Sequence, residues 1–418
     1  MISPARAALA ADLADRAFRG PIAASMSPRK LGAEVEFIPV ESLTGQRCAI
    51  DADGVLSTLP FLRSYGSAQG WRESRTAKGT PCFTLPAGGM LTYEPGGQLE
   101  FSSPPCRAAS TLLAVLRSAV IPLREAAAGE GIDLLAAGID PYSPIEQAPM
   151  LLHASRYQRM AEYLARRGPA GARMMRQTAA FQVNVDFDDE PWLRWRVLNA
   201  AAPYVVAIFA NSPVYAGEPT GHQSARADAW RNLDPTRTGV PYDQQAPVEA
   251  YLKFALGAPA ILLPTVGGEH LPFGEWLTRG QPTEEEWQDH LTTLFPEVRP
   301  RGHLELRSAD AIAPEWYAAP VALTAGMLYD SGALRAAVDL LPAPDPALLE
   351  RAGRLGLHDA AIAQTAVDLF EIALSGCARI GPRYFHPSDI EQARAYFDRY
   401  TRLSRAPADD VVQDAIAA

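Results

Sequence analysis

The sequence predicts an α+β fold with a mainly antiparallel sheet, because it contains two kinds of periodic segment. Four short segments alternate strictly between apolar and polar residues, which is typical of strands with one buried face. They lie at 33–37, 98–102, 181–187 and 303–307. Longer segments with apolar residues three and four positions apart predict helices, and from about residue 343 onward only such segments occur.

The helical periodicity places helices at 108–128, 155–167, 191–210, 283–295, 344–356, 359–376 and 388–402. Thr283 with Glu286 forms a capping box at one helix start, and Ser388 with Glu391 forms another. Prolines and glycines are scattered and form no long linker. We therefore expect a single catalytic domain over 1–418, with a core at about 30–330 and a helical C-terminal part over 343–418.

Composition excludes several classes of protein. The chain has 418 residues, 48% of them hydrophobic, so it can bury a sizeable core, and its net charge of −10 argues against nucleic-acid binding. Four cysteines without a CxxC motif indicate a reducing, cytoplasmic location. No apolar stretch approaches the roughly 20 residues that cross a bilayer, and the N-terminal residues lack a signal-peptide core. Without heptads, we expect a monomer or homodimer.

If the four strands share a sheet, their polar residues lie on one face. A solvated sheet face is the plain alternative, but such faces normally carry Thr, Lys and Ser, whereas this one is crowded with mutually repelling carboxylates. Divalent cations would turn that repulsion into attraction. The face would carry Glu34, Glu36, Glu100, Gln182, Asn184, Asp186, His303, Glu305 and Arg307.

These residue types favour Mg²⁺, with Mn²⁺ as a possible substitute. Carboxylate and amide oxygens are hard ligands, and Glu34 and Glu36 would lie about 6–7 Å apart on one strand, close enough to share or bridge metal ions. Mg²⁺ usually shares its coordination shell with phosphates, which points to ATP. Arg307 would place a cation beside developing phosphoryl charge. A plain salt bridge between Arg307 and a sheet carboxylate is equally open.

Two glycine-containing turns, at 86–90 and 94–98, flank a possible strand. Neither matches a phosphate-binding loop, and both can be read as flexible hairpin turns. Glu94 gains interest because its turn leads into the strand of Glu100, so its side chain could bend back toward the same ion. Nucleophilic catalysis has no support, since the chain has no GxSxG motif and its cysteines are best read as small core residues.

Several segments together resemble the plant and proteobacterial type of glutamate–cysteine ligase, a carboxylate–amine ligase family with the glutamine synthetase catalytic fold. The resemblance covers roughly 30–330, and the EPGGQLE and MMRQTAAFQVNVD motifs are its most specific parts. The matching segments are LGAEVEFIPV (31–40), LTYEPGGQLEFSSPP (91–105), GIDPYSP (138–144) and the longer stretches 156–187, 224–243 and 290–310.

This resemblance implies a glutamine synthetase-like fold, in which a curved antiparallel sheet forms an acidic cradle and helices pack on its outer face. It also implies an ATP-dependent reaction: the γ-carboxylate of glutamate attacks the γ-phosphate of ATP, and the amine of cysteine then displaces phosphate from γ-glutamyl phosphate. The substrates would be glutamate, cysteine and ATP. The product would serve glutathione synthesis or a related thiol pathway such as ergothioneine synthesis.

Roles for individual residues also follow from the resemblance. Catalytic roles are implied for Arg237, Arg307 and Glu305. Because an acyl phosphate must be shielded from water, a lid is also expected, with the turn-rich stretch 211–245 as its candidate and an inert surface loop as the alternative reading of that stretch. Arg226 and Arg237 look like ligands of the glutamate carboxylate or acyl phosphate, while Gln182, Asn184 and Arg307 would contact ATP. The metal ligands would be Glu34, Glu36, Glu94, Glu100 and Glu305.

The sequence departs from the family pattern at two places, Pro300-Arg301 and Arg307-Ser308, which makes cysteine less secure as the acceptor than the ligase chemistry itself. Another amine acceptor is therefore an alternative. A metal-dependent phosphohydrolase using the same acidic site is a second, and a protein that only binds glutamate or nucleotide is a third. Only Cys377 lies in the second half of the chain, so a plant-like disulfide switch is not expected.

Overall fold

A computed structural model describes residues 4–18, 29–77, 79–187, 189–243, 245–279 and 282–417. Within these residues, nine strands form one sheet in the order β10–β11–β7–β1–β5–β4–β3–β2, with β6 paired to the far half of β1, and all pairings are antiparallel. The strands are β1 (Leu31–Glu41), β2 (Arg72–Arg75), β3 (Pro81–Thr84), β4 (Met90–Tyr93), β5 (Leu99–Ser102), β6 (Ile132–Leu135), β7 (Ala180–Val185), β10 (Val298–Pro300) and β11 (Leu304–Asp310). A separate hairpin pairs β8 (Val214–Tyr215) with β9 (Glu218–Pro219).

The four predicted strands are consecutive neighbours, in the order β11–β7–β1–β5, which confirms the antiparallel sheet and its shared polar face. The register places Glu34 opposite Gln182 and Glu36 opposite Glu100. Glu305 lies opposite Asn184. Because side chains alternate along each strand, these pairings bring the predicted polar residues together on one face.

The helices follow the predicted order with shifted ends. Helix α12 carries the predicted capping box between Thr283 and Glu286, but it ends at Leu291 and not near residue 295. The capping box predicted for Ser388 is wrong: the cap of α17 is His386, whose side chain accepts from the Ser388 backbone amide. The helices are α1 (Pro4–Asp12), α3 (Thr58–Ala68), α4 (Ala109–Gly129), α5 (Ser155–Ala165), α6 (Ala170–Gln177), α7 (Pro191–Ile208), α8 (Ala225–Arg231), α9 (Pro235–Thr238), α10 (Pro247–Gly257), α11 (Phe273–Arg279), α12 (Glu284–Leu291), α13 (Ala318–Tyr329), α14 (Ser331–Leu340), α15 (Pro346–Leu355), α16 (Ala360–Ile380), α17 (Pro387–Arg399) and α18 (Pro407–Ala417), with short turns η1 (Leu13–Ala17), η2 (Ile145–Gln147), η3 (Pro314–Trp316), η4 (Gly356–His358) and η5 (Thr401–Leu403).

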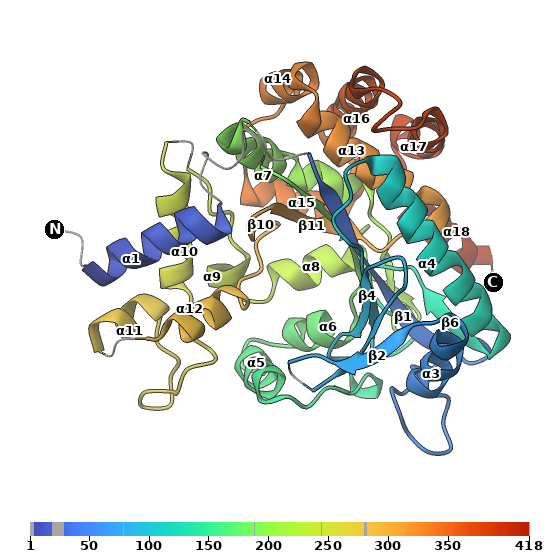
Figure 1. Ribbon diagram of the computed structural model, residues 1–418, viewed down its shortest axis with the longest axis horizontal. Helices are drawn as coiled ribbons and strands as arrows, with labels where there is room; N and C mark the ends of the chain where they lie inside the picture. Colours follow the sequence, from blue (N-terminus) through green and yellow to red (C-terminus); the bar gives the residue numbers. More distant parts are fainter. Residues whose placement is uncertain are drawn as a thin grey trace.

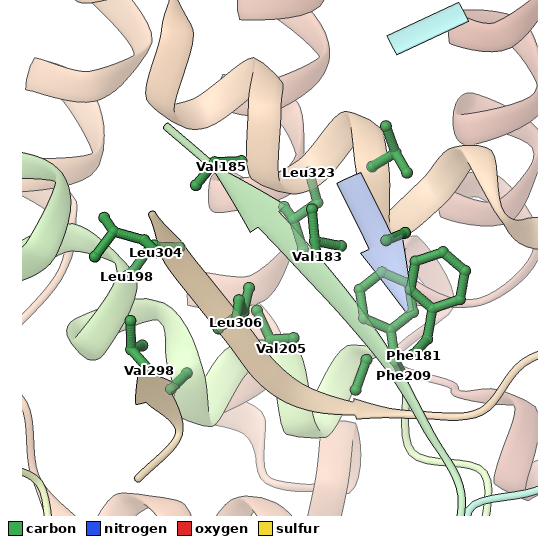
Figure 2. Packing of buried hydrophobic residues seen from close by; sticks show 14 of the residues in the cluster. Phe181, Val183, Val185, Leu198, Val205, Phe209, Val298, Leu304, Leu306 and Leu323 are labelled. Atoms are coloured by element: carbon green, nitrogen blue, oxygen red, sulfur yellow. The ribbon is translucent and has the colours of Figure 1, made fainter. Parts of the chain in front are cut away.

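Helices α4, α7 and α13 pack on the apolar face of the sheet, on the side away from the acidic residues. Figure 2 shows Val183 and Leu306 of adjacent strands against Val205 of α7 and Leu323 of α13. All four side chains are at most 2% exposed. This packed layer fixes the sheet, and therefore the opposite face, in position.

The C-terminal helices belong to the same hydrophobic core as the sheet. Helix α16 crosses α13 so closely that a Cβ on Gly376 would lie 2.1 Å from the Gly326 carbonyl oxygen. The expectation that no apolar stretch is long enough to cross a bilayer is wrong for α16, which could do so by length and composition alone. However, half of its most apolar 18 residues are buried inside the protein, as in the core helix of a globular fold.

Candidate active site

A cavity of about 740 Å³ lies on the polar face of the sheet. The sheet forms its floor, and α5, α6, α8 and α12, which lie to the left of β1 and β4 in Figure 1, contribute its walls. Four glutamates line it and are called the acidic wall: Glu34, Glu36, Glu94 and Glu100. Six arginines line it and are called the basic wall: Arg16, Arg156, Arg226, Arg299, Arg301 and Arg307. Asp12 and Asp289 also line the cavity. The cavity therefore presents opposite charges to whatever binds in it.

Neighbouring donors orient the carboxylates on β1. Glu36 accepts hydrogen bonds from the Ala180 backbone amide (2.7 Å) and from Gln182 Nε2 (3.1 Å). Glu34 accepts from Asn184 Nδ2 (3.2 Å). The amide oxygens Oε1 of Gln182 and Oδ1 of Asn184 are buried, and neither has a hydrogen-bond partner among the described residues. Each amide thus holds a glutamate with its donor. Gln182 lines the cavity and leaves its amide oxygen free for another ligand there, whereas Asn184, predicted to contact ATP, does not line the cavity.

The electrostatic environment of these glutamates disfavours their charged forms. Burial raises the pKa of Glu100 well above its ordinary value, and the neighbouring Glu34, Glu94 and Glu36 raise it further. Burial likewise raises the pKa values of Glu34 and Glu36. Such shifts are expected where carboxylates share a confined site. A bound divalent cation would relieve this repulsion.

The donor set fits a hard cation that completes its shell with substrate. Among the described residues, no group of three or more His, Cys, Asp or Glu side chains is arranged to hold a metal ion by itself. Mg²⁺ is seldom held in such an all-protein cage, because it is usually bound by one or two carboxylates, water and phosphate oxygens. The unpartnered amide oxygens beside Glu34 and Glu36 are further hard donors.

The turn between β4 and β5 carries Glu94 to the cavity. Its glycines suggested a flexible turn, but contacts with α6 and the following residue hold its conformation. Gln98 accepts from the Gly96 amide (3.0 Å) and donates to the Thr178 carbonyl (3.0 Å). A Cβ on Gly96 would lie 2.2 Å from the Arg176 carbonyl oxygen. Gly96 is therefore required for close approach to the end of α6, and this contact positions the turn.

Comparisons with known proteins show which family this chain belongs to. A model described as Glutamate-cysteine ligase family 2 (GCS2) matches residues 30–413. The chain belongs to this family. Glutamate–cysteine ligase EgtA of Mycolicibacterium smegmatis is 32% identical over 349 residues, covering 80% of this chain and 79% of that protein. The chloroplastic glutamate–cysteine ligase of Arabidopsis thaliana is 30% identical over 341 residues, covering 76% of this chain and 65% of that protein.

A solved structure supports the fold assignment. The crystal structure of a glutamate–cysteine ligase from Francisella tularensis, in complex with AMP, superposes with a TM-score of 0.54. The match covers 92% of this chain and 84% of that one at 14% identity. At this level of identity the match establishes the shared fold. The roles of individual side chains in this family member must come from its own geometry.

Glu305 differs from the other four predicted metal ligands. Its side chain is fully buried, and it pairs with Arg299 (2.5 Å), Arg307 (3.2 Å) and Arg301 (3.5 Å). Burial alone would raise the pKa of Glu305, but these guanidinium groups hold it well below its usual range. Glu305 does not line the cavity, whereas its three arginine partners do. Its carboxylate therefore holds the basic wall together.

Arg226 and Arg307 form a second part of the basic wall. Arg226 Nη2 donates to the Arg307 carbonyl (2.8 Å), and both guanidinium groups lie over the Trp230 ring, at 5.2 and 5.5 Å from its centroid. Trp230 itself donates to the Phe295 carbonyl (3.1 Å). The two cations are thus pre-positioned at the cavity, as expected for groups that bind carboxylate or phosphate.

The structure does not bring Arg237 to the cavity. Its side chain is fully buried between Asp234 (3.3 Å), the Tyr163 ring (5.0 Å) and the carbonyl (3.0 Å) and hydroxyl (2.8 Å) oxygens of Thr293. It fastens α9 to the segment after α12. The predicted lid at 211–245 likewise contains buried scaffold, because Arg226, Trp230 and Asp234 are at most 7% exposed. Of this stretch, Arg226 and Trp230 line the cavity.

Other cavity residues were not predicted. Arg299 on β10 and Arg301 in the β10–β11 turn both line the cavity, and only Arg301 drew notice in the sequence, as a departure from the family pattern. Arg156 reaches the cavity from α5 and donates to Thr292 Oγ1 (2.9 Å). Arg299 could have been recognised from the sequence, because it lies two residues before Arg301 and shortly before a predicted strand. No local pattern marks Arg156 apart from other helical arginines.

Proposed function

We propose that this family member is an ATP-dependent ligase that forms γ-glutamylcysteine from glutamate and cysteine through γ-glutamyl phosphate. The observation that carries the proposal is that four glutamates from β1, β5 and the β4–β5 turn line the same cavity as six arginines. A triphosphate with its cations suits the acidic part, and the carboxylates of amino acids suit the basic part.

The division of labour between the walls follows from charge. Mg²⁺ held by Glu34, Glu36, Glu94 and Glu100 would neutralise phosphate charge, with Mn²⁺ as a possible substitute. Gln182 and Asn184 orient Glu36 and Glu34. Gln182 also lines the cavity, where its unpartnered amide oxygen is a further acceptor, whereas Asn184 acts through Glu34. Arg307 and Arg226 bind the anionic groups that meet during phosphoryl transfer, where positioning and charge neutralisation supply most of the catalysis.

In this proposal Arg237 and Glu305 act through other residues. Arg237 supports the wall that carries Arg226, and Glu305 orders Arg299, Arg301 and Arg307. Neither side chain lines the cavity. Their substitution should therefore affect substrate binding through the position of the arginines, and not through a lost contact with substrate or metal.

The acceptor is proposed to be cysteine because part of the cavity wall is apolar and rich in sulfur. Met160, Met174, Met175, Trp230 and Phe295 all line it and pack in one hydrophobic cluster. Thioethers and aromatic rings suit a weakly polar thiol and offer little hydrogen bonding to a hydroxyl.

We therefore expect strong discrimination between cysteine and serine. Burying the serine hydroxyl against this wall without a partner costs about 1–3 kcal/mol, which corresponds to a loss of roughly fivefold to 150-fold in kcat/KM. Steady-state kinetics with cysteine, serine and 2-aminobutyrate, in which a methyl group replaces the thiol, tests this. The kcat/KM for 2-aminobutyrate should be much closer to that for cysteine than the kcat/KM for serine is. Equal use of serine and cysteine would contradict the assignment of the wall.

A coupled assay of ADP release with Mg²⁺, ATP, glutamate and a panel of amino acids tests the proposed reaction, with the product mass measured. We expect ADP formation to require glutamate, to be strongest with cysteine, and to yield γ-glutamylcysteine. Phosphate release that is indifferent to amino acids would instead indicate a phosphohydrolase. Turnover with another amine but not cysteine would indicate a different acceptor.

We further propose that the enzyme works in the cytoplasm as a monomer or homodimer and supplies glutathione or a related thiol. All four cysteines are buried and free of disulfides, as expected in a reducing compartment. Burial raises the pKa of the Cys377 thiol, which makes it unreactive. Activity should therefore be insensitive to mild oxidants.

A further inference from the structure

The N-terminal segment Pro4–Phe18 lies beside the active-site cavity. It consists of α1 and the π-helical turn η1, and Figure 1 shows α1 alongside α10 and α12 at the left of the molecule. Asp12, Arg16 and Ala17 line the cavity. The segment precedes residues 30–413, which the family model matches, so family membership assigns it no role.

Polar contacts fasten this segment to two parts of the cavity rim. Asp12 accepts hydrogen bonds from Trp287 Nε1 and Gln288 Nε2 of α12, both at 2.9 Å, and pairs with Arg16 (3.0 Å). Arg16 also pairs with Glu284 at the start of α12. The Ala17 carbonyl accepts from the amide of Gly302 (2.8 Å), in the turn beside Arg301. The segment thus bridges α12 and the basic wall.

An aromatic anchor holds the end of the same segment. Phe18 is 1% exposed, and its ring lies 5.2 Å from Trp195, 5.4 Å from Trp192 and 5.7 Å from Tyr251. Such a cluster stabilises by burial and edge contacts between rings. Because Phe18 does not line the cavity, the anchor fixes the segment, while the polar residues Asp12 and Arg16 face the site.

We propose that Asp12 and Arg16 are positioning residues that close this side of the cavity against water during the ligase reaction. The inference rests on the proposed function.

γ-Glutamyl phosphate can react at its carbonyl carbon in two ways. Attack by the amine forms the C–N bond, breaks the bond to the phosphate oxygen and releases phosphate and a proton. Attack by water breaks the same bond but forms glutamate, so ATP is consumed without product. Excluding water favours the first reaction.

The test is the ratio of phosphate released to dipeptide formed, measured on the full chain with saturating glutamate and cysteine. The wild type should release close to one phosphate per dipeptide. Asp12→Ala removes the acceptor for Trp287, Gln288 and Arg16, so we expect this ratio to rise several-fold. Asp12→Asn keeps one acceptor oxygen and should restore part of the coupling. Arg16→Gln, at an exposed position on the rim, provides a second variant if Asp12→Ala folds poorly.

Arg6→Ala is the matched control. It removes the Arg6–Glu249 ion pair, which fastens the same helix to α10 outside the cavity. We expect its phosphate-to-dipeptide ratio to equal that of the wild type. The inference is overturned if the Asp12 and Arg16 variants keep the wild-type ratio, or if Arg6→Ala raises it equally. Failure of the proposed function would be seen separately, as a wild type that makes no γ-glutamyl product.

Discussion

Replacing Glu100 by glutamine is expected to lower ligase turnover by about a hundredfold to a thousandfold, while the metal-free protein becomes at least as stable as the wild type. Glu100 lies in the acidic wall beside Glu34, Glu36 and Glu94, and its carboxylate accepts a hydrogen bond from Ser102 (3.0 Å). Glutamine keeps the shape and an oxygen acceptor but removes the charge that a divalent cation needs. It also removes repulsion that the metal-free protein must tolerate.

The sign of the pH dependence follows from the raised pKa of Glu100. A carboxyl group that binds its proton more tightly in the folded state stabilises the fold at pH values below its unfolded pKa, and this contribution is lost as pH rises through the folded pKa. Thermal melting of metal-free protein between about pH 5 and 8 should therefore show declining stability for the wild type. The decline should be weaker for Glu100→Gln. A large loss of stability in this variant would identify Glu100 as a structural carboxylate.

Glu305→Gln is expected to have the opposite effect on stability, with a loss of about 3–5 kcal/mol in the free energy of unfolding. The Glu305 carboxylate is fully buried and neutralises Arg299 and Arg307, which are themselves largely buried. Its removal leaves guanidinium groups without a counterion in a region of low dielectric. Urea unfolding of the metal-free variant, compared with the wild type, measures this loss.

The contribution of Glu305 to stability depends on pH in the opposite direction to that of Glu100. The pKa of Glu305 is depressed in the folded state, so its stabilising contribution is present above its unfolded pKa and is lost as pH falls through the folded pKa. Adding Arg299→Met to Glu305→Gln removes one of the unpaired cations and should recover part of the lost stability. Wild-type stability in Glu305→Gln alone, together with a higher Mg²⁺ concentration needed for half-maximal activity, would instead assign Glu305 to the metal.

Much of the fold and of the acidic wall could be predicted because strand alternation is a local signal. The spacing of Glu34 and Glu36 placed both on one face, and the antiparallel register then added Glu100 and Gln182. The sequence also predicted that Glu94 lies near Glu100, because its turn leads into the strand of Glu100. It did not predict what fixes that turn. The contact between Gly96 and Arg176 depends on tertiary packing and leaves no pattern in the sequence.

The environment of Glu305 was partly open to prediction, because Arg307 lies two residues away and a salt bridge between Arg307 and a sheet carboxylate was one of the two alternatives. The position of Arg237 away from the cavity was not, because its partner Thr293 lies 56 positions further along the chain. The contact between Asp12 and Trp287, 275 positions apart, is equally invisible to periodicity. Local patterns thus predicted the sheet, whereas the basic wall and the N-terminal closure required the structure.

The most direct test of the central claim is Mn²⁺ binding in the presence of a non-hydrolysable ATP analogue, measured by electron paramagnetic resonance. The wild type should be compared with Glu34→Gln, Glu36→Gln, Glu94→Gln and Glu100→Gln, with folding checked by circular dichroism. The account predicts that each substitution weakens Mn²⁺ binding, because all four carboxylates face the same cavity. Wild-type Mn²⁺ affinity in all four folded variants would contradict it.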